Sequence, residues 1–250
     1  MISSDRIERA LRHIREFASR AAELIMGITP EDLVEEGGLN PYMVASLGIN
    51  NIRDAVELFV YRRVERSLGT SFGNAIEAFL RDLLGGISGK DHRECKRQRG
   101  KSWMCWWDVV VEGEYVETAK RYKGIVLAVR SGPADFNKDI VERFVQHARE
   151  AEQNGYRPYL VLTYGKRAFG VAESTLRSKG LDPQNYMLVG REVFRRLLGQ
   201  DLYDDVVEKI FSASKGLDIF GLMEKKVEEL TAQLRDRYGD DIRKLLKDLS

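Results

Sequence analysis

Four short runs rich in Val, Ile, Leu and Tyr constrain the fold of this chain more than any other feature. Each is bounded by glycine or a turn, and they cover residues 106–111, 124–129, 159–164 and 186–189. Runs of this kind are typical of β-strands. Helical patterns follow the second and fourth runs, at residues 138–154 and 192–198. This alternation predicts an α/β core with a central mixed β-sheet flanked by helices.

Both ends of the chain carry helical periodicity. Apolar residues recur at spacings of three and four over residues 4–26, and further amphipathic patterns cover 51–67 and 71–84. A late stripe at residues 222–245 places Val227, Leu230, Leu234, Tyr238, Ile242 and Leu245 on one face. We therefore expect a helical N-terminal segment at 1–70, an α/β core at 71–200 and C-terminal helices at 201–250, packed as one compact unit.

Charge and apolar content exclude some classes of protein. Lys and Arg number 40 against 39 Asp and Glu, so a nucleic-acid surface must come from local clustering. No apolar run approaches the roughly 20 residues that span a bilayer, and the N-terminus lacks the apolar region of a secretory signal. We expect a soluble cytoplasmic protein without membrane contact, in which Cys95 and Cys105 are free thiols.

A carboxylate and a cation stand on neighbouring predicted strands. Asp108 interrupts the first apolar run, and Arg130 ends the second, in GIVLAVRSGPADFN. Asp108 by itself fits a salt-bridged structural role equally well. Phosphodiester hydrolysis uses carboxylates to hold Mg²⁺ and a cation to offset the developing charge. Glu77, on the predicted helix before the sheet, would complete such a set.

These residues carry a resemblance. The strand Asp, the basic residue that ends the next strand and the string VRSGPADFNKD resemble the PD-(D/E)xK nuclease superfamily and the KSGPN segment of type II restriction endonucleases. Resemblance to the PmeII-like group extends over roughly residues 40–210. Its further pieces are Asn40-Pro41-Tyr42, Phe72-Gly73, Gly85-Gly86 and VGREVFRRLLGQDLYDDV.

The resemblance implies a restriction-endonuclease-like fold, Mg²⁺ as cofactor with Mn²⁺ as a substitute, and catalytic roles for Asp108, Glu77 and Arg130. It departs from the family pattern at two positions, since Ala128 replaces an acidic residue and Arg130 replaces lysine. Alanine offers no metal ligand, so the second acid must come from Glu77 or, as the second choice, Glu142. The carbonyl of Val129 would be a further ligand. Arginine stays protonated, so it would clamp phosphate but not act as a base.

The segment KDHRECKRQRGKS, residues 90–102, holds six Lys and Arg against two acids. A basic run of this kind is as often only a solvent-exposed face. Because this one lies directly before the predicted strand with Asp108, we expect it to contact DNA phosphates. The expected DNA-contacting residues are Lys96, Arg97, Arg99, Lys101, Ser131, Asn137, Lys138, Lys166 and Arg167. A zinc site at His92, Cys95 and Cys105 would match no common spacing. Of the three tryptophans we expect at least one to be buried.

The leading hypothesis is a type II restriction endonuclease that cuts double-stranded DNA at a specific site. A palindromic target would require a homodimer, with the N-terminal third and the stripe at 222–245 as candidate surfaces, although each stripe equally fits core packing. One alternative is a DNA-binding protein with an impaired nuclease fold. Another is a repair or junction nuclease that recognises DNA structure. The recognition sequence, cut position and overhang cannot be read from the residues.

Overall fold

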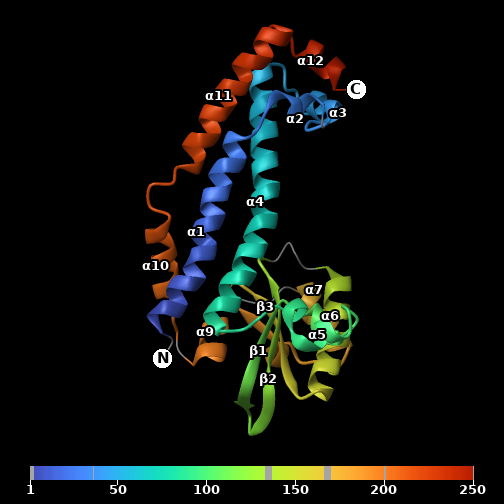
Figure 1. Ribbon diagram of the computed structural model, residues 1–250. Coiled ribbons are helices and arrows are strands. Elements are labelled where there is room, and N and C mark those ends of the chain that lie inside the picture. Colours follow the sequence, from blue (N-terminus) through green and yellow to red (C-terminus); the bar gives the residue numbers. More distant parts are fainter. Residues whose placement is uncertain (1–2, 36, 133–136, 166–169, 200, 250) are drawn as a thin grey trace. The chain divides into compact units, whose positions relative to one another are not determined.

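The computed structural model describes residues 3–35, 37–132, 137–165, 170–199 and 201–249, which form two compact units (Figure 1). Unit 1 consists of Met1–Arg15 and Phe72–Ala213, and unit 2 of Glu16–Ser71 and Ser214–Ser250. This division differs from the single compact unit expected from the sequence. The physical reason is that the helices of unit 2 bury an apolar core of their own, while the sheet of unit 1 is covered separately.

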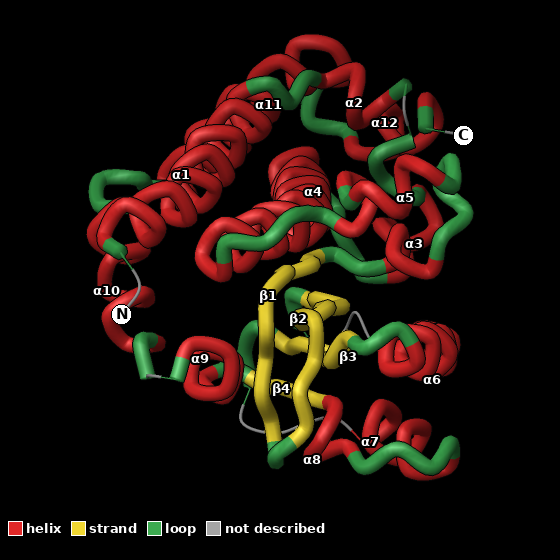
Figure 2. Tube along the Cα trace, turned by 60° about the horizontal axis from the view of Figure 1, so that its bottom comes forward, coloured by secondary structure: helices red, strands yellow, loops and turns green. Residues whose placement is uncertain are grey.

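A four-stranded mixed sheet is the centre of unit 1 (Figure 2). Its strands are β1 (Val109–Glu117), β2 (Lys120–Arg130), β3 (Tyr156–Leu162) and β4 (Met187–Val189), in the spatial order β1-β2-β3-β4. The pair β1/β2 is antiparallel, whereas β2/β3 and β3/β4 are parallel. The predicted α/β class with a mixed sheet is therefore confirmed.

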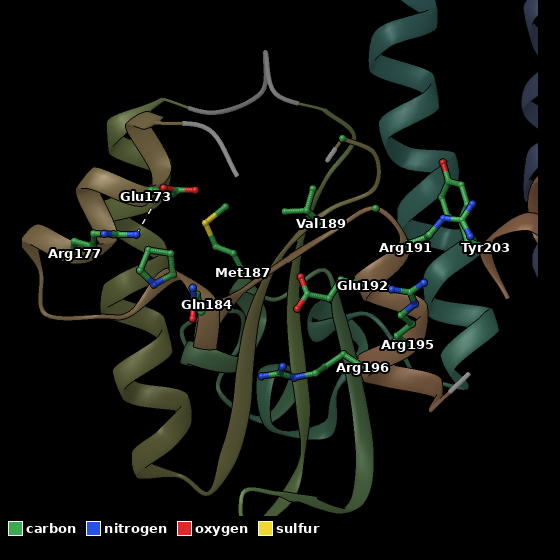
Figure 3. A pocket seen from close by; sticks show the side chains of 13 residues that line it. Glu173, Arg177, Gln184, Met187, Val189, Arg191, Glu192, Arg195, Arg196 and Tyr203 are labelled. Atoms are coloured by element: carbon green, nitrogen blue, oxygen red, sulfur yellow. Dashed lines mark ion pairs between the residues drawn. The ribbon is translucent and has the colours of Figure 1, made fainter. Parts of the chain in front are cut away.

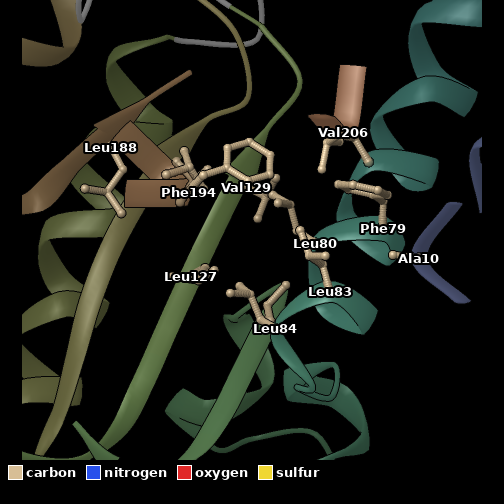
Figure 4. Close-up of a cluster of buried hydrophobic side chains, with 14 of the residues drawn as sticks. Ala10, Phe79, Leu80, Leu83, Leu84, Leu127, Val129, Leu188, Phe194 and Val206 are labelled. Atoms are coloured by element: carbon tan, nitrogen blue, oxygen red, sulfur yellow. The ribbon is translucent and has the colours of Figure 1, made fainter. Parts of the chain in front are cut away.

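Side chains of β2 alternate between two apolar clusters, one on each face of the sheet. Ile125, Leu127 and Val129 belong to the cluster that includes Phe79 and Leu83 of α4 (Ile52–Leu84) (Figure 4). Val126 and Ala128 belong to the opposite cluster, with Phe144 of α6 (Lys138–Gln153). Successive side chains of a strand point to opposite faces of the sheet. Because both faces are covered here, both sets of side chains are apolar, and the strand appears in the sequence as a continuous apolar run.

The remaining helical segments of unit 1 frame this sheet. They are η1 (Gly89–Asp91), α5 (Arg93–Arg97), η2 (Trp103–Trp106), α6 (Lys138–Gln153), α7 (Gly170–Ser178), α8 (Pro183–Tyr186), α9 (Arg191–Leu198), α10 (Tyr203–Ala213) and the start of α1 (Ser4–Met26). None of the helices in the described residues is long and apolar enough to cross a membrane.

The β1–β2 hairpin is longer than predicted. The stretch 112–123 was expected to be a polar connection, but β1 continues to Glu117 and β2 begins at Lys120. Thr118 and Ala119 form the turn with φ values of 47° and 65°. Two-residue hairpin turns need such positive φ values, which Gly and Asn adopt most readily. Because neither residue type occurs there, no turn could be predicted at this point of the chain.

Helix α4 is continuous where two helices, at 51–67 and 71–84, were expected. The side-chain hydroxyls of Thr70 and Ser71 donate to the carbonyls of Arg66 and Ser67, at 3.2 and 2.7 Å. Each hydroxyl thus bonds to a carbonyl one turn earlier in the same helix, and the helix continues through this point. The apolar faces on either side of this point contact different cores, which explains the interruption in the pattern.

A close approach of backbones positions the start of β1. The Gly89 N–H donates to the Trp107 carbonyl at 3.0 Å, and a Cβ at Gly89 would lie 2.2 Å from the Met104 carbonyl. The residues before β1 form η2, so the predicted strand at 106–111 begins three residues later, at Val109. Asp108 therefore precedes the strand instead of interrupting it.

Unit 2 is helical and contains the C-terminal stripe. Besides the later part of α1 and the first part of α4, it contains α2 (Pro30–Val34), α3 (Pro41–Ser46), α11 (Ile219–Tyr238) and α12 (Ile242–Asp248). The stripe spans two helices, and its members from Val227 to Leu245 are buried with Ile25, Phe59 and Val60. Core packing within the chain thus accounts for this stripe, and it is not an open dimer surface.

Candidate functional site

Asp108 lies at the point where β1 begins, directly beside the end of β2. Its N–H donates to the Leu127 carbonyl at 3.0 Å, which extends the β1/β2 ladder by one residue. Its carboxylate Oδ2 accepts a hydrogen bond from the Val129 N–H at 2.7 Å. The backbone of β2 therefore fixes the position of this carboxylate.

Arg130, the last residue of β2, holds the same carboxylate. Its Nη1 lies 3.2 Å from Asp108 Oδ2, and both side chains are 22% exposed. Nη1 also donates to the carbonyl of Val129. One guanidinium nitrogen thus bridges two oxygens from neighbouring strands, while β2 presents the charge at the end of the sheet.

Glu77 approaches this pair from α4. A Cβ at Gly73, one turn earlier on the helix, would lie 3.8 Å from Ser131 Oγ, so this face of α4 adjoins the end of β2. Burial raises the pKa of Glu77 to about 7, and the negative charge of Asp108 adds to the shift. Arg130 opposes both effects. Glu77, Asp108 and Arg130 therefore share one electrostatic environment.

Burial also raises the pKa of Asp108 above its ordinary value, although the charge of Arg130 and the Val129 N–H favour the ionised form. Of the two carboxyls, Glu77, with a pKa of about 7, can hold and release a proton close to neutral pH. Raised values of this kind are typical of chemically active sites, but structural ion pairs produce them as well.

Two cations near the site were not singled out from the sequence. Both pKa values are raised overall, but the positive charge of Lys90 reduces the rise for Glu77 and Asp108, and that of Arg81 reduces the rise for Glu77. Lys90 belongs to the basic segment 90–102, and the Gly89–Trp107 hydrogen bond brings it towards Asp108. Arg81 lies one turn beyond Glu77 on α4, so helical spacing is the signal that would have found it.

Glu142 has different partners. Its Oε1 lies 3.0 Å from Nζ of Lys179 and 4.0 Å from Nζ of Lys138. These lysines lower the pKa of Glu142, as expected for a carboxylate in ordinary ion pairs. Because the charge of Asp108 acts on Glu77, we keep Glu77 as the second acid.

Ala128 is buried, with 1% of its surface exposed, in the cluster on the α6 side of the sheet. Since Val109 pairs with Leu127, Ala128 lies across the ladder from Asp108. The position where the resembling family carries an acid therefore adjoins Asp108, but here it is filled by a methyl group.

The oxygen atoms at this site suit a hard divalent cation such as Mg²⁺, which prefers carboxylate and carbonyl ligands. They belong to Asp108, Glu77 and the backbone of Val129. No cluster of three or more His, Cys, Asp and Glu side chains with metal-binding geometry occurs in the described residues. Arg130 already donates to an oxygen of two of these three groups, Asp108 Oδ2 and the Val129 carbonyl. The donor set thus fits Mg²⁺ in chemistry, provided that Arg130 turns to another anion.

The predicted DNA-contacting residues fall into separate groups. Lys96 pairs with Asp91 at 3.3 Å, Lys138 lies within 4.0 Å of Glu142, and Asn137 caps α6 through the Ile140 N–H. Ser131 follows Arg130 directly, and its carbonyl accepts from Thr163 Oγ1. The others on the basic segment are exposed, namely Arg97, Arg99 and Lys101. Lys166 and Arg167 lie outside the described residues.

The cysteines were predicted wrongly. Cys95 in α5 and Cys105 in η2 form a disulfide across ten residues. A zinc site at these residues is excluded in this state, and the Nε2 of His92 instead lies 2.7 Å from Glu112. Spacing alone could not show that the two short segments fold against each other. The prediction for tryptophan is confirmed, since Trp107 is 1% exposed.

A wide cavity of about 1060 Å³ lies between α7–α8 and α9 (Figure 3). Four arginines line it, but each has an acidic partner. Arg191 pairs with Asp204, Arg195 with Asp201, Arg196 with Glu117 and Arg177 with Glu173. Because these charges are balanced, the cavity does not replace the Asp108 site as a candidate for binding anions.

No family model matches this chain, and no curated protein matches it either. The function is therefore inferred from the geometry of the site.

Proposed function

We propose that this protein is a type II restriction endonuclease that hydrolyses phosphodiester bonds at a specific site in double-stranded DNA, with Mg²⁺ as cofactor. One observation carries the proposal. A partly buried carboxylate directly before β1, an arginine at the end of β2 and a second acid on α4 share one electrostatic environment. Phosphodiester hydrolysis needs these groups within reach of one phosphate.

Each residue has a defined task. Arg130 would leave Asp108 for a non-bridging oxygen of the phosphate, where its fixed charge offsets the charge of the transition state. Glu77 would be the second carboxylate, which holds the metal and orients the attacking water. Asp108, Glu77 and the Val129 carbonyl would hold Mg²⁺, which, when bound, polarises the phosphate and acidifies water.

Lys90 and the exposed cations of residues 96–101 would neutralise the flanking phosphates. Cleavage of both strands at a palindromic site needs two copies of the active site related by a dyad, so the proposal includes a homodimer. The stripe at 222–245 is buried within the chain, so a dimer would use another surface.

The test is a digest of plasmid and phage DNA with purified protein in Mg²⁺ or Mn²⁺. Discrete bands are expected from the wild-type protein and none from Asp108→Ala, which should still shift duplex DNA in a gel without metal. Asp91→Ala is the control, because it removes an exposed acid from the segment just before the site. Near-normal cleavage by Asp108→Ala would remove Asp108 from the active site.

A second candidate is a protein that binds DNA without cutting it. The buried methyl group of Ala128 and the bridging of Asp108 and Val129 by Arg130 favour this function, because both reduce the number of metal ligands. A gel shift with no cleavage under either metal would support it. In that case Ala128→Glu combined with Arg130→Lys should restore cutting.

A further inference from the structure

A second polar cavity, of about 510 Å³, lies between α5, η2 and the first residues of β2 and β3. We call it the Trp103 pocket, after the indole in its wall. Lys123 lines it, seven residues before Arg130 on the same strand, so it is about 20 Å from the Asp108 site. It shares no residue with that site.

The lining of the Trp103 pocket is basic. Arg93, Arg97 and Lys123 face the cavity, against one carboxylate, that of Glu94. Glu94 is already engaged, since its Oε1 accepts a hydrogen bond from Ser102 Oγ at 2.9 Å. None of the three cations forms an ion pair with another residue in the described chain, in contrast to the arginines of the cavity beside α9.

The two arginines are held close together. They are four residues apart on α5 and so lie on one face, where like charges repel. The disulfide between Cys95 and Cys105 ties this helix to η2, which carries Trp103. An anion between the guanidinium groups would offset the repulsion, and the covalent tie reduces the ordering that binding requires.

The lining of the Trp103 pocket also includes two aromatic rings. Trp103 is half-buried and meets Tyr156 edge to face, with ring centroids 5.6 Å apart. Tyr156 is fixed in turn, because its hydroxyl donates to Glu112, which also holds the buried His92. A rigid indole beside three cations presents a surface for a planar ring and a phosphate together.

We propose that the Trp103 pocket binds a nucleotide. Arg93, Arg97 and Lys123 bind its phosphate, and the base lies against Trp103. The nucleotide is either free or the 5′-phosphorylated end of a DNA strand, since both present the same groups. The pocket volume falls within the range of small-ligand sites. None of these residues belongs to the proposed catalytic centre at Asp108, and only Arg97 is shared with the cations proposed to contact flanking phosphates, so nucleotide binding and DNA cleavage can fail separately.

The experiment is calorimetric titration of the full chain in EDTA, under non-reducing conditions. The probes are inorganic phosphate, AMP, TMP, and a tetranucleotide with either a 5′-phosphate or a 5′-hydroxyl. We expect the nucleotides to bind at least tenfold more tightly than phosphate. Preference for the phosphorylated tetranucleotide over AMP and TMP would assign the pocket to strand ends, and the reverse would assign it to free nucleotides.

Variants connect binding to the pocket. Arg93→Gln with Arg97→Gln should weaken nucleotide binding at least 30-fold, whereas Arg121→Gln, on the same strand as Lys123 but outside the lining, should change it less than twofold. Trp103→Leu should reduce nucleotide affinity to that of phosphate and leave phosphate binding unchanged. Circular dichroism checks that each variant is folded. Absence of nucleotide binding at millimolar concentration, or wild-type affinity in the double arginine variant, would overturn the inference.

Discussion

Arg130 Nη1 lies 3.2 Å from Asp108 Oδ2 and also donates to the Val129 carbonyl. A guanidinium therefore occupies the position between two oxygens that a divalent cation would share. In the proposed metal site the ion pair and Mg²⁺ would compete for these atoms, so removal of either partner of the ion pair tests that site without an assay of cleavage.

The first prediction concerns this competition. Arg130→Ala should bind Mn²⁺ without DNA at least tenfold more tightly than the wild-type protein, because two oxygens become free and a repelling charge is lost. Isothermal titration with Mn²⁺ measures the difference. Lys90→Ala is the control, since it removes a nearby charge but leaves the Arg130 contacts in place. An equal increase in Mn²⁺ affinity in both variants would show that the loss of a positive charge, and not the release of the two oxygens, causes the effect.

The second prediction concerns pH. The pKa of Glu77 in the folded protein, about 7, exceeds its ordinary value of 4.5. Folding therefore favours the protonated form, and this stabilisation is complete below pH 4.5 and is lost as the pH rises through 7. The full shift corresponds to about 3 kcal/mol, which contact with solvent reduces to about 1–2 kcal/mol.

Glu77→Gln should accordingly lose less stability between pH 5 and pH 8 than the wild-type protein does. Urea unfolding followed by tryptophan fluorescence measures this, because all three tryptophans lie in unit 1. The exposed Glu208 on α10 provides the control variant Glu208→Gln. If Glu77→Gln and the control show the same pH dependence, Glu77 is not the group that titrates.

The third prediction places a carboxylate at the buried position opposite Asp108. Ala128→Glu should lower the stability of unit 1 by about 2–4 kcal/mol in EDTA, because a charge is buried beside a like charge. Mn²⁺ should recover part of this loss and raise the melting temperature. Ala128→Gln has the same size without the charge, so its melting temperature should not respond to the metal. An equal response of the two variants would contradict the placement.

The fourth prediction concerns the disulfide. Cys95→Ser combined with Cys105→Ser should lower the free energy of unfolding by about 2–3 kcal/mol, because the unfolded chain loses a ten-residue loop constraint. The wild-type protein in a reducing agent should show the same loss, measured by urea unfolding. Nucleotide binding in the Trp103 pocket should weaken in parallel. Unchanged stability under reduction would mean that the cysteines are not paired in solution.

The sequence by itself determined the class of fold and most helices and strands. Apolar runs such as 124–129 are buried on both faces of the sheet, and this makes them continuous and easy to recognise. Asp108 and Arg130 were also identifiable, since a charge at the end of such a run is costly unless it is paired or used.

The tertiary structure alone decided which groups meet. Glu77, and not Glu142, shares the electrostatic environment of Asp108 because α4 packs against the end of β2. The disulfide depends on α5 and η2 folding together, and the hairpin depends on two positive φ values at Thr118 and Ala119. These features arise from contacts between residues distant in the chain, or from backbone conformations that the residue types do not favour. The periodicity of apolar residues along the chain predicts neither these long-range contacts nor these backbone conformations.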